Sequence, residues 1–137
     1  MRTAAVAGTA AAGILVYDVM WPLVYRGVPG LRPILDVVLT IAAFVIPFVI
    51  GVVLGRSEAP GRASVLTAGV GAVDSTLGWA ISRWIGPGRR DLGDGSSAVI
   101  QIMLTIVAVV AIYGVFGLAG AVTGRRWNRH RSARAGR

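Results

Sequence analysis

Four apolar stretches divide the 137-residue chain, and each reaches the length of about 20 residues that a helix needs to cross a membrane. The connections between them are short and rich in Gly and Pro, which end helices and turn the chain. Short connections force consecutive spans to run in opposite directions. The sequence therefore predicts an all-α integral membrane protein, with four transmembrane helices in a compact antiparallel bundle. The expected spans cover residues 4–25, 34–55, 63–85 and 98–123.

These spans place residues 1–124 in one transmembrane domain and leave residues 125–137 as a basic cytoplasmic tail. The first span has a second interpretation. Met1 and Arg2 precede an Ala-rich run, and residues 10–12 are small enough for signal-peptide cleavage. Apolar character nevertheless continues to Trp21 and Tyr25, which suit the aromatic belt at a membrane surface. We expect an uncleaved first span, with cleavage as the alternative.

The arginines indicate the orientation, because positive charge is retained on the cytoplasmic side. In a four-span topology the N-terminus, the middle connection and the tail share one side, and the two other connections share the opposite side. The first side carries nine arginines and the second carries five. We therefore expect both termini in the cytoplasm. All 14 basic residues are Arg, which favours a GC-rich genome and hence a bacterial plasma membrane.

The tail after Gly124 carries six arginines. Basic residues beside a membrane attract anionic lipid headgroups. Nucleic-acid binding is the alternative, but a single Trp among the arginines is a poor platform for stacking bases. We expect lipid headgroups as partners, and no nucleic acid. The expected contacts are Arg125, Arg126, Arg129 and Arg131.

Small residues recur at three- or four-residue spacing within the spans, which places them on one face of each helix. Helices in lipid associate through such faces, because lipid tails are as apolar as the side chains that they replace. Helix packing is therefore the expected role of this set. Its members are Gly51 and Gly55 in the second span, Gly71 and Gly78 in the third, and Gly117, Gly120 and Gly124 in the fourth.

Two segments of the first half resemble two segments of the second half, in the same order. Residues 12–18 resemble residues 68–74, and residues 51–56 resemble residues 120–125. The bundle would then consist of two tandem helical hairpins related by a pseudo-twofold axis along the membrane normal. Asp18 and Asp74 would be equivalent and would face each other near that axis. The alternative is a chance match within low-complexity membrane sequence.

Acidic residues within a membrane span are costly, and they indicate a functional site by default. Asp74 lies near the centre of the third span, and Asp18 lies within the first. A proton- or cation-coupling site is one hypothesis. An interhelical hydrogen bond, or an ion pair of Asp74 with Arg83, is the other. Asp36 lies in the first turn of the second span, where a structural role is expected. The expected polar site comprises Asp74, Asp18, Thr40, Thr105 and Gln101.

Several enzyme classes are excluded by composition. The chain has no Cys and no Lys, and its single His lies in the basic tail. Thiolate metal sites, Schiff-base lysines and Ser-His triads are therefore not expected. Tyr17-Asp18 resembles the Tyr-Asp motif of the presenilin and signal-peptide-peptidase families. Their second motif, Gly-x-Gly-Asp, is missing, because two residues separate Gly71 from Asp74. We therefore assign no family, no enzymatic activity, no cofactor and no metal.

The leading expectation is a non-enzymatic accessory or scaffold subunit of the cell membrane, forming a homo-oligomer or binding another membrane protein. The alternative is a small homo-oligomeric transporter or channel that uses an intramembrane Asp, with a phage-holin-like pore as a variant. The two differ in where Asp74 points. A transporter needs Asp74 at a water-accessible cavity, whereas a scaffold needs it satisfied by a neighbouring helix.

Overall fold

The computed structural model describes residues 2–81 and 96–135. In chain order they form α1 (Arg2–Gly27), the 3₁₀ turn η1 (Pro29–Leu31), α2 (Arg32–Gly55), α3 (Pro60–Val73), the π-helical turn η2 (Asp74–Gly78) and α5 (Ser96–Ala135). These ranges contain no β-strand, as predicted. Three segments are long and apolar enough to cross a membrane, Thr3–Gly27, Pro29–Gly55 and Ser96–His130, and they indicate a membrane protein.

The third predicted span is only partly described. The chain is helical from residue 60 to residue 81, but the π-helical turn interrupts the α-helix after 14 residues. The predicted end at residue 85, the proposed partner Arg83 and the connection around residues 91–95 lie outside the described residues. A fourth membrane crossing therefore stays a prediction.

Two helices begin at prolines, and the last helix extends further than expected. Pro33 and Pro60 stand in the first turns of α2 and α3, where the missing N–H costs nothing. The predicted division at Gly124 is not a helix end, because α5 continues to Ala135. No Gly or Pro interrupts residues 125–135, and Arg and Ala favour helix. The 40 residues of α5 span about 60 Å, about twice the hydrocarbon thickness of a membrane.

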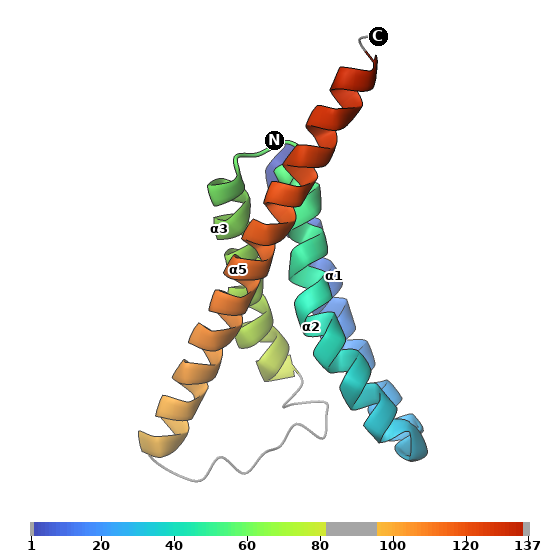
Figure 1. Ribbon diagram of the computed structural model, residues 1–137. Helices are drawn as coiled ribbons and strands as arrows, with labels where there is room; N and C mark the ends of the chain where they lie inside the picture. The colour runs from blue at the N-terminus through green and yellow to red at the C-terminus, as the bar shows by residue number, and fades with distance from the viewer. Residues whose placement is uncertain (1, 82–95, 136–137) are drawn as a thin grey trace.

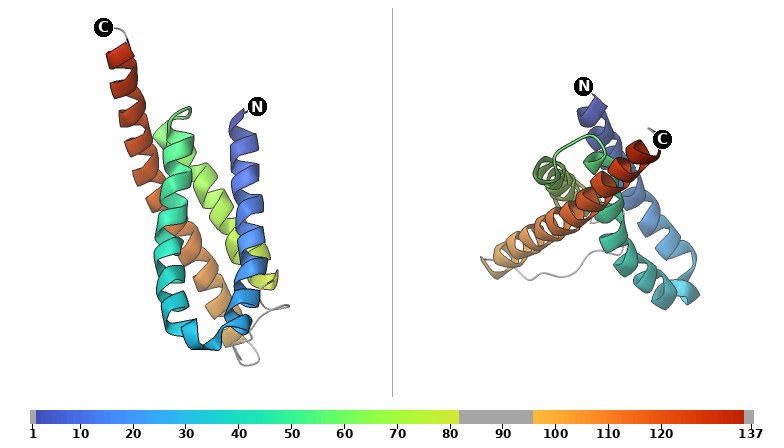
Figure 2. Two further views of the ribbon diagram at one scale, coloured as in Figure 1. Left: turned by 90° about the vertical axis from the view of Figure 1, so that its right-hand side faces the viewer. Right: turned by 45° about the horizontal axis from the view of Figure 1, so that its top comes forward.

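Consecutive helices alternate in direction, so that the N-terminus, the α2–α3 connection and the C-terminus lie at one end of the molecule (Figures 1 and 2). Helix α5 packs along both α2 and α3, whereas α1 makes fewer contacts, which it divides among η2, α2 and α3. At the opposite end α1 and α2 diverge from α5 (Figure 1). The tightest part of the fold is therefore the half that holds the termini.

Glycines bring the backbones of α2 and α5 into direct contact. Gly51 lies against Gly117, and a Cβ added to Gly51 would stand 2.8 Å from the Gly117 Cα. Gly55 lies against the Ala121 backbone in the same way. From the other side, Gly120 lies against Phe48 and Gly124 lies against Val52. Close approach of this kind is the main source of helix association in lipid.

These contacts are reciprocal. Gly51 and Gly120 are 69 residues apart, and so are their contacts Phe48 and Gly117. The same offset relates Gly55 to Gly124, and it relates their contacts Val52 and Ala121. Each contact is therefore repeated with the two helices exchanged: Gly51 of α2 meets Gly117 of α5, and Gly120 of α5 meets Phe48 of α2. Such an exchange is the mark of a twofold interface. The α2–α5 contact is therefore a pseudo-twofold contact, in the register of the sequence repeat.

The interior is small, and the apolar surface is large. One buried cluster comprises Ile14, Val70 and Tyr113, and the other comprises Leu54, Ala63 and Ala121. Most large apolar side chains point outward, such as Val65 at 71% exposure and Val115 at 66%. A continuous apolar surface of this extent is unusual for a soluble monomer. It suits contact with lipid.

The glycine contact between α2 and α5 predicts a difference between two matched substitutions. Gly51→Ala should lower the free energy of unfolding in detergent by about 1–3 kcal/mol, because the new methyl group overlaps the Gly117 backbone. Gly13→Ala, in α1, should not lower it, because nothing lies within 4 Å of a Cβ added there. Thermal unfolding followed by circular dichroism measures both. Equal losses in the two variants would contradict the proposed role of the contact.

Candidate functional site

Two carboxyl groups from different helices face each other inside the fold. Asp18 lies on α1, and Asp74 is the first residue of η2. Their side chains are at hydrogen-bonding range of each other. The hydroxyl group of Tyr113, from α5, is at the same range of Asp74, and the Tyr17 hydroxyl lies near both acids. We call these four residues the Asp–Tyr cluster.

The π-helical turn positions Asp74. Within η2 the hydroxyl groups of Ser75 and Thr76 donate hydrogen bonds back to the Ala72 carbonyl oxygen, at 3.3 and 2.6 Å. Back-bonding by Ser and Thr competes with the helical ladder and bends helices. A single π-helical turn inside an α-helix is often found at a functional site. In this turn the two hydroxyl groups share one acceptor, two residues before Asp74.

Gly78 lets α1 approach this turn. A Cβ added to Gly78 would stand 2.8 Å from Cγ of Asp18 and 3.3 Å from Oδ1 of Asp74. Any larger residue would displace the Asp18 carboxyl group. Gly78 therefore permits the close approach of α1 to η2, which is one of the segments that α1 contacts.

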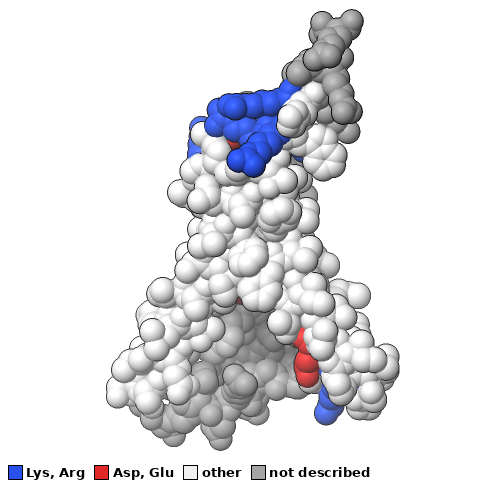
Figure 3. Space-filling view, in the orientation of Figure 1, with Lys and Arg blue, Asp and Glu red and all other residues white. Residues whose placement is uncertain are grey.

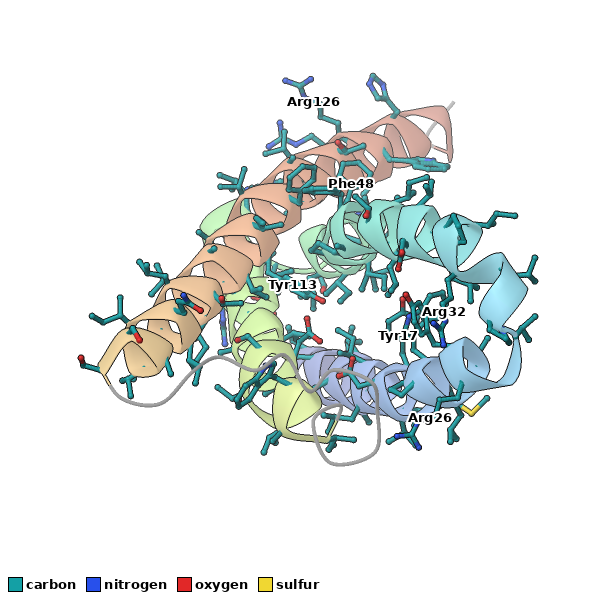
Figure 4. The ribbon with its side chains drawn as sticks, turned by 90° about the horizontal axis from the view of Figure 1, so that it is seen from below. Tyr17, Arg26, Arg32, Phe48, Tyr113 and Arg126 are labelled. Atoms are coloured by element: carbon teal, nitrogen blue, oxygen red, sulfur yellow. The ribbon has the colours of Figure 1, made fainter. Side chains whose placement is uncertain are left out.

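A cavity of about 210 Å³ adjoins the Asp–Tyr cluster. Figure 4 shows the helices around this space, with Tyr17 and Tyr113 on their inner sides and Arg26 and Arg126 pointing outward. Apart from the four cluster residues its walls are apolar, and they come from α1, α2 and α5. The apolar lining consists of Ile14, Leu39, Ala42, Ala43, Ile46, Val109 and Ile112.

Three buried polar atoms on α1 lack a hydrogen-bond partner among the described residues. They are the Tyr17 hydroxyl oxygen, Oδ2 of Asp18 and Nε1 of Trp21. The rings of Tyr17 and Trp21 stack at 5.7 Å, so one face of α1 presents these groups together. Buried polar groups in folded proteins are normally hydrogen-bonded. This face therefore has unused capacity to bind a polar solute or water.

The arrangement does not fit a common metal centre. No group of three or more His, Cys, Asp or Glu residues comes together within residues 2–81 and 96–135. Two carboxyl groups alone provide too few ligands for zinc or calcium. They suit a proton, a water molecule or a monovalent cation instead.

The structure brings together only part of the predicted polar site. Asp18 and Asp74 meet, whereas Thr40, Thr105 and Gln101 lie on exposed faces. The Thr40 hydroxyl donates to the Asp36 carbonyl oxygen and the Thr105 hydroxyl to the Gln101 carbonyl oxygen, both at 2.8 Å. Such bonds within one helix satisfy threonine without a partner helix. These three residues therefore do not surround Asp74.

The seven glycines expected at helix contacts are all buried, and each lies against another segment. Gly71 lies against the Tyr113 ring and Gly117 against Thr67, which adds α3 to the α2–α5 pair. Among the tail residues, Arg125, Arg126 and Arg129 are exposed, and the side chain of Arg131 lies outside the described part. Asp36 is exposed.

Sequence analysis missed the two tyrosines as members of the site. Tyr113 lies one helical turn before Gly117 and two turns before Gly120, which places it on the packed face of α5. A phenol in that register needs a polar partner from a neighbouring helix. The signal was therefore present, although nothing in the sequence identifies Asp74 as that partner. For Tyr17 the sequence offers only the Tyr-Asp motif that it forms with Asp18.

Comparison with protein-family models, with curated proteins and with solved structures found no match to this chain.

The close contact at Gly78 predicts the effect of adding one methyl group. Gly78→Ala should displace the Asp18 carboxyl group and so shift the carboxyl bands in infrared spectra. It should also lower the free energy of unfolding by about 1–3 kcal/mol. Gly69→Ala, on α3, is the matched control, because nothing lies within 4 Å of a Cβ added there. Unchanged carboxyl bands in Gly78→Ala would contradict this geometry.

Proposed function

We propose that the chain is a small multi-pass membrane protein that carries protons or a small cation through the Asp–Tyr cluster. The observation that supports this function is the pairing of Asp18 and Asp74 beside a cavity bounded by α1, α2, η2 and α5. Tyr113 satisfies Asp74 from a neighbouring helix, as a scaffold requires. A scaffold needs neither a second acid beside the first nor a cavity, however, and both are present. The site therefore favours the transporter over the accessory subunit, which was the leading expectation from sequence.

The chemistry follows from placing two acids together. Two carboxyl groups at hydrogen-bonding range repel each other when both are ionised, so a proton, a cation or a donor between them is favourable. Tyr113 and Tyr17 supply hydroxyl groups that can pass a proton or solvate a cation. The apolar walls confine the exchange to this point. Loading and release of charge at such a pair is the elementary step of a coupled carrier.

The size of the cavity limits the solute. Sites for drug-sized ligands usually measure about 300–1,000 Å³. The cavity of about 210 Å³ lies below that range. It therefore suits a proton with its water, or a small monovalent cation, better than a large organic molecule.

We propose a topology of four spans in an antiparallel bundle, with both termini in the cytoplasm. The membrane is the cell membrane of a bacterium. The reciprocal contacts of α2 with α5 and the meeting of Asp18 with Asp74 support two tandem hairpins around a pseudo-twofold axis. Assembly into a homo-oligomer is part of this proposal.

A flux assay tests the function. In liposomes carrying an internal pH-sensitive dye, the wild-type protein should dissipate an imposed proton gradient. Asp74→Asn and Asp18→Asn should each lower the rate at least about tenfold, because each removes one carboxyl group of the pair. Asp36→Asn is the matched control, since Asp36 is an exposed acid of α2. It should retain the wild-type rate.

Infrared difference spectroscopy separates the two functional classes. A carboxyl band that changes reversibly with pH and disappears in Asp74→Asn would support a water-accessible site. The carrier hypothesis fails if no band titrates, no flux is measured and Asp74→Asn only lowers thermal stability. Asp74 would then be a structural contact, and the protein would be a scaffold.

The pairing of two aspartates also meets one requirement of an intramembrane aspartyl protease, in which two acids share a water molecule. The small cavity and the missing Gly-x-Gly-Asp motif weigh against this second candidate. Cleavage of a transmembrane peptide by the wild type, with loss in both Asn variants, would establish it.

A further inference from the structure

A second cluster of charge lies at the opposite end from the diverging helices, where both termini are found. Figure 3 shows basic side chains gathered there over α5 and the α2–α3 connection. The set combines Arg56 of the connection with three residues of α5, and Arg62 of α3 lies beside it through an ion pair with Glu58. The three residues of α5 are Arg125, Arg126 and Arg129.

The continuous helix α5 aligns two of these arginines. Arg125 and Arg129 are four residues apart, so both project on the same side of the helix. They line two adjoining clefts, of about 150 and 310 Å³. Arg126 and Pro60 complete the smaller cleft with Val122, and the α2–α3 connection forms the other wall of the larger one. We call the pair of clefts the arginine cleft.

The position of this helix end is stabilised by contacts with the connection. The Asn128 side chain donates a hydrogen bond to the Arg56 carbonyl oxygen at 3.3 Å. The Arg56 guanidinium lies 5.7 Å from the centre of the Trp127 ring. The arginine cleft therefore belongs to the folded structure, unlike a flexible basic tail.

Most of the charge in the arginine cleft is unneutralised. Its one acid, Glu58, pairs with Arg62 at 3.5 Å and accepts a hydrogen bond from Thr3 at 2.5 Å. Within the described part of the chain, Arg125, Arg126 and Arg129 form no ion pair. Adjacent guanidinium groups are favourable when an anion lies between them, and their planar geometry matches phosphate.

An apolar side chain in the smaller cleft indicates which kind of anion fits there. Val122, which lines the smaller cleft, lies one helical turn before Arg125 and Arg126 and is 37% exposed. The exposed apolar surface of α5 continues from it through Leu118 and Val115. A ligand that fills this site needs a phosphate group at one end and an acyl chain at the other. Free phosphate and nucleic acid lack the second part.

We propose that the arginine cleft binds the phosphate group of an anionic phospholipid, with Arg125 and Arg129 as the principal contacts and an acyl chain along Val122. This site differs from a general attraction of the tail to the membrane, because it includes the α2–α3 connection. It is also independent of the Asp–Tyr cluster, so either proposal can fail alone.

Native mass spectrometry of the full-length protein in detergent tests the proposal, with phosphatidylglycerol and phosphatidylcholine as probes. The wild type should bind phosphatidylglycerol at least about tenfold more tightly than phosphatidylcholine. The double variant Arg125→Gln with Arg129→Gln should lose most of that preference. Arg26→Gln with Arg32→Gln is the matched control, because it removes the same charge at the opposite end. The control should keep the wild-type preference.

Equal losses in the two double variants would overturn the site, since the effect would then be one of net charge. Displacement of the lipid by inorganic phosphate at similar concentration would assign the cleft to free phosphate and overturn the lipid. Tighter binding of an oligonucleotide than of the lipid, dependent on Arg125 and Arg129, would also overturn it. Arg125→Lys with Arg129→Lys keeps the charge, and it should retain part of the preference if the fold is intact.

Discussion

The contact of the α2 and α5 backbones at their glycines is the constraint on which the rest of the structure depends. In lipid, apolar side chains gain little by leaving the surface, so helices need backbone proximity and polar contacts to associate. Gly51 against Gly117 and Gly124 against Val52 provide that proximity. Helix α3 also packs against α5. There Thr67 contacts Gly117, and the Ser64 hydroxyl donates a hydrogen bond to the Gly114 carbonyl oxygen at 2.7 Å. Helix α1 contacts η2, α2 and α3 and makes fewer contacts than the other long helices.

The Asp–Tyr cluster is a consequence of these helix contacts. Tyr113 lies one turn from Gly117, so the α2–α5 crossing determines where its hydroxyl group points. The π-helical turn directs Asp74 toward it, and Gly78 leaves room for Asp18. Three helices therefore contribute polar groups to one point, where the packing leaves a cavity. Buried polar groups of this kind cost stability, and a functional use is the usual reason for them.

The two ends of the molecule differ in charge and in packing. The end with the termini combines the closest helix contacts with the arginine cleft, whereas α1, α2 and α5 diverge at the other end. The pseudo-twofold contact of α2 with α5 does not extend equally to the outer helices, because α3 packs closely along α5 while α1 makes few contacts with α2. The cavity occupies the side where α1 stands apart. The candidate site is therefore asymmetric about the α2–α5 contact.

The sequence by itself determined the helices, because runs of about 20 apolar residues and Gly-Pro connections allow few other structures. It also offered the equivalence of Asp18 and Asp74 as one of two interpretations, since both follow similar strings of small and apolar residues. Only the tertiary structure decided that Tyr113 joins Asp74, that Thr40 and Thr105 stay outside, and that Arg56 shares a cleft with Arg125. Helical periodicity tells which residues share a face. The rotation and crossing of each helix, which decide which faces meet, arise from packing between distant segments.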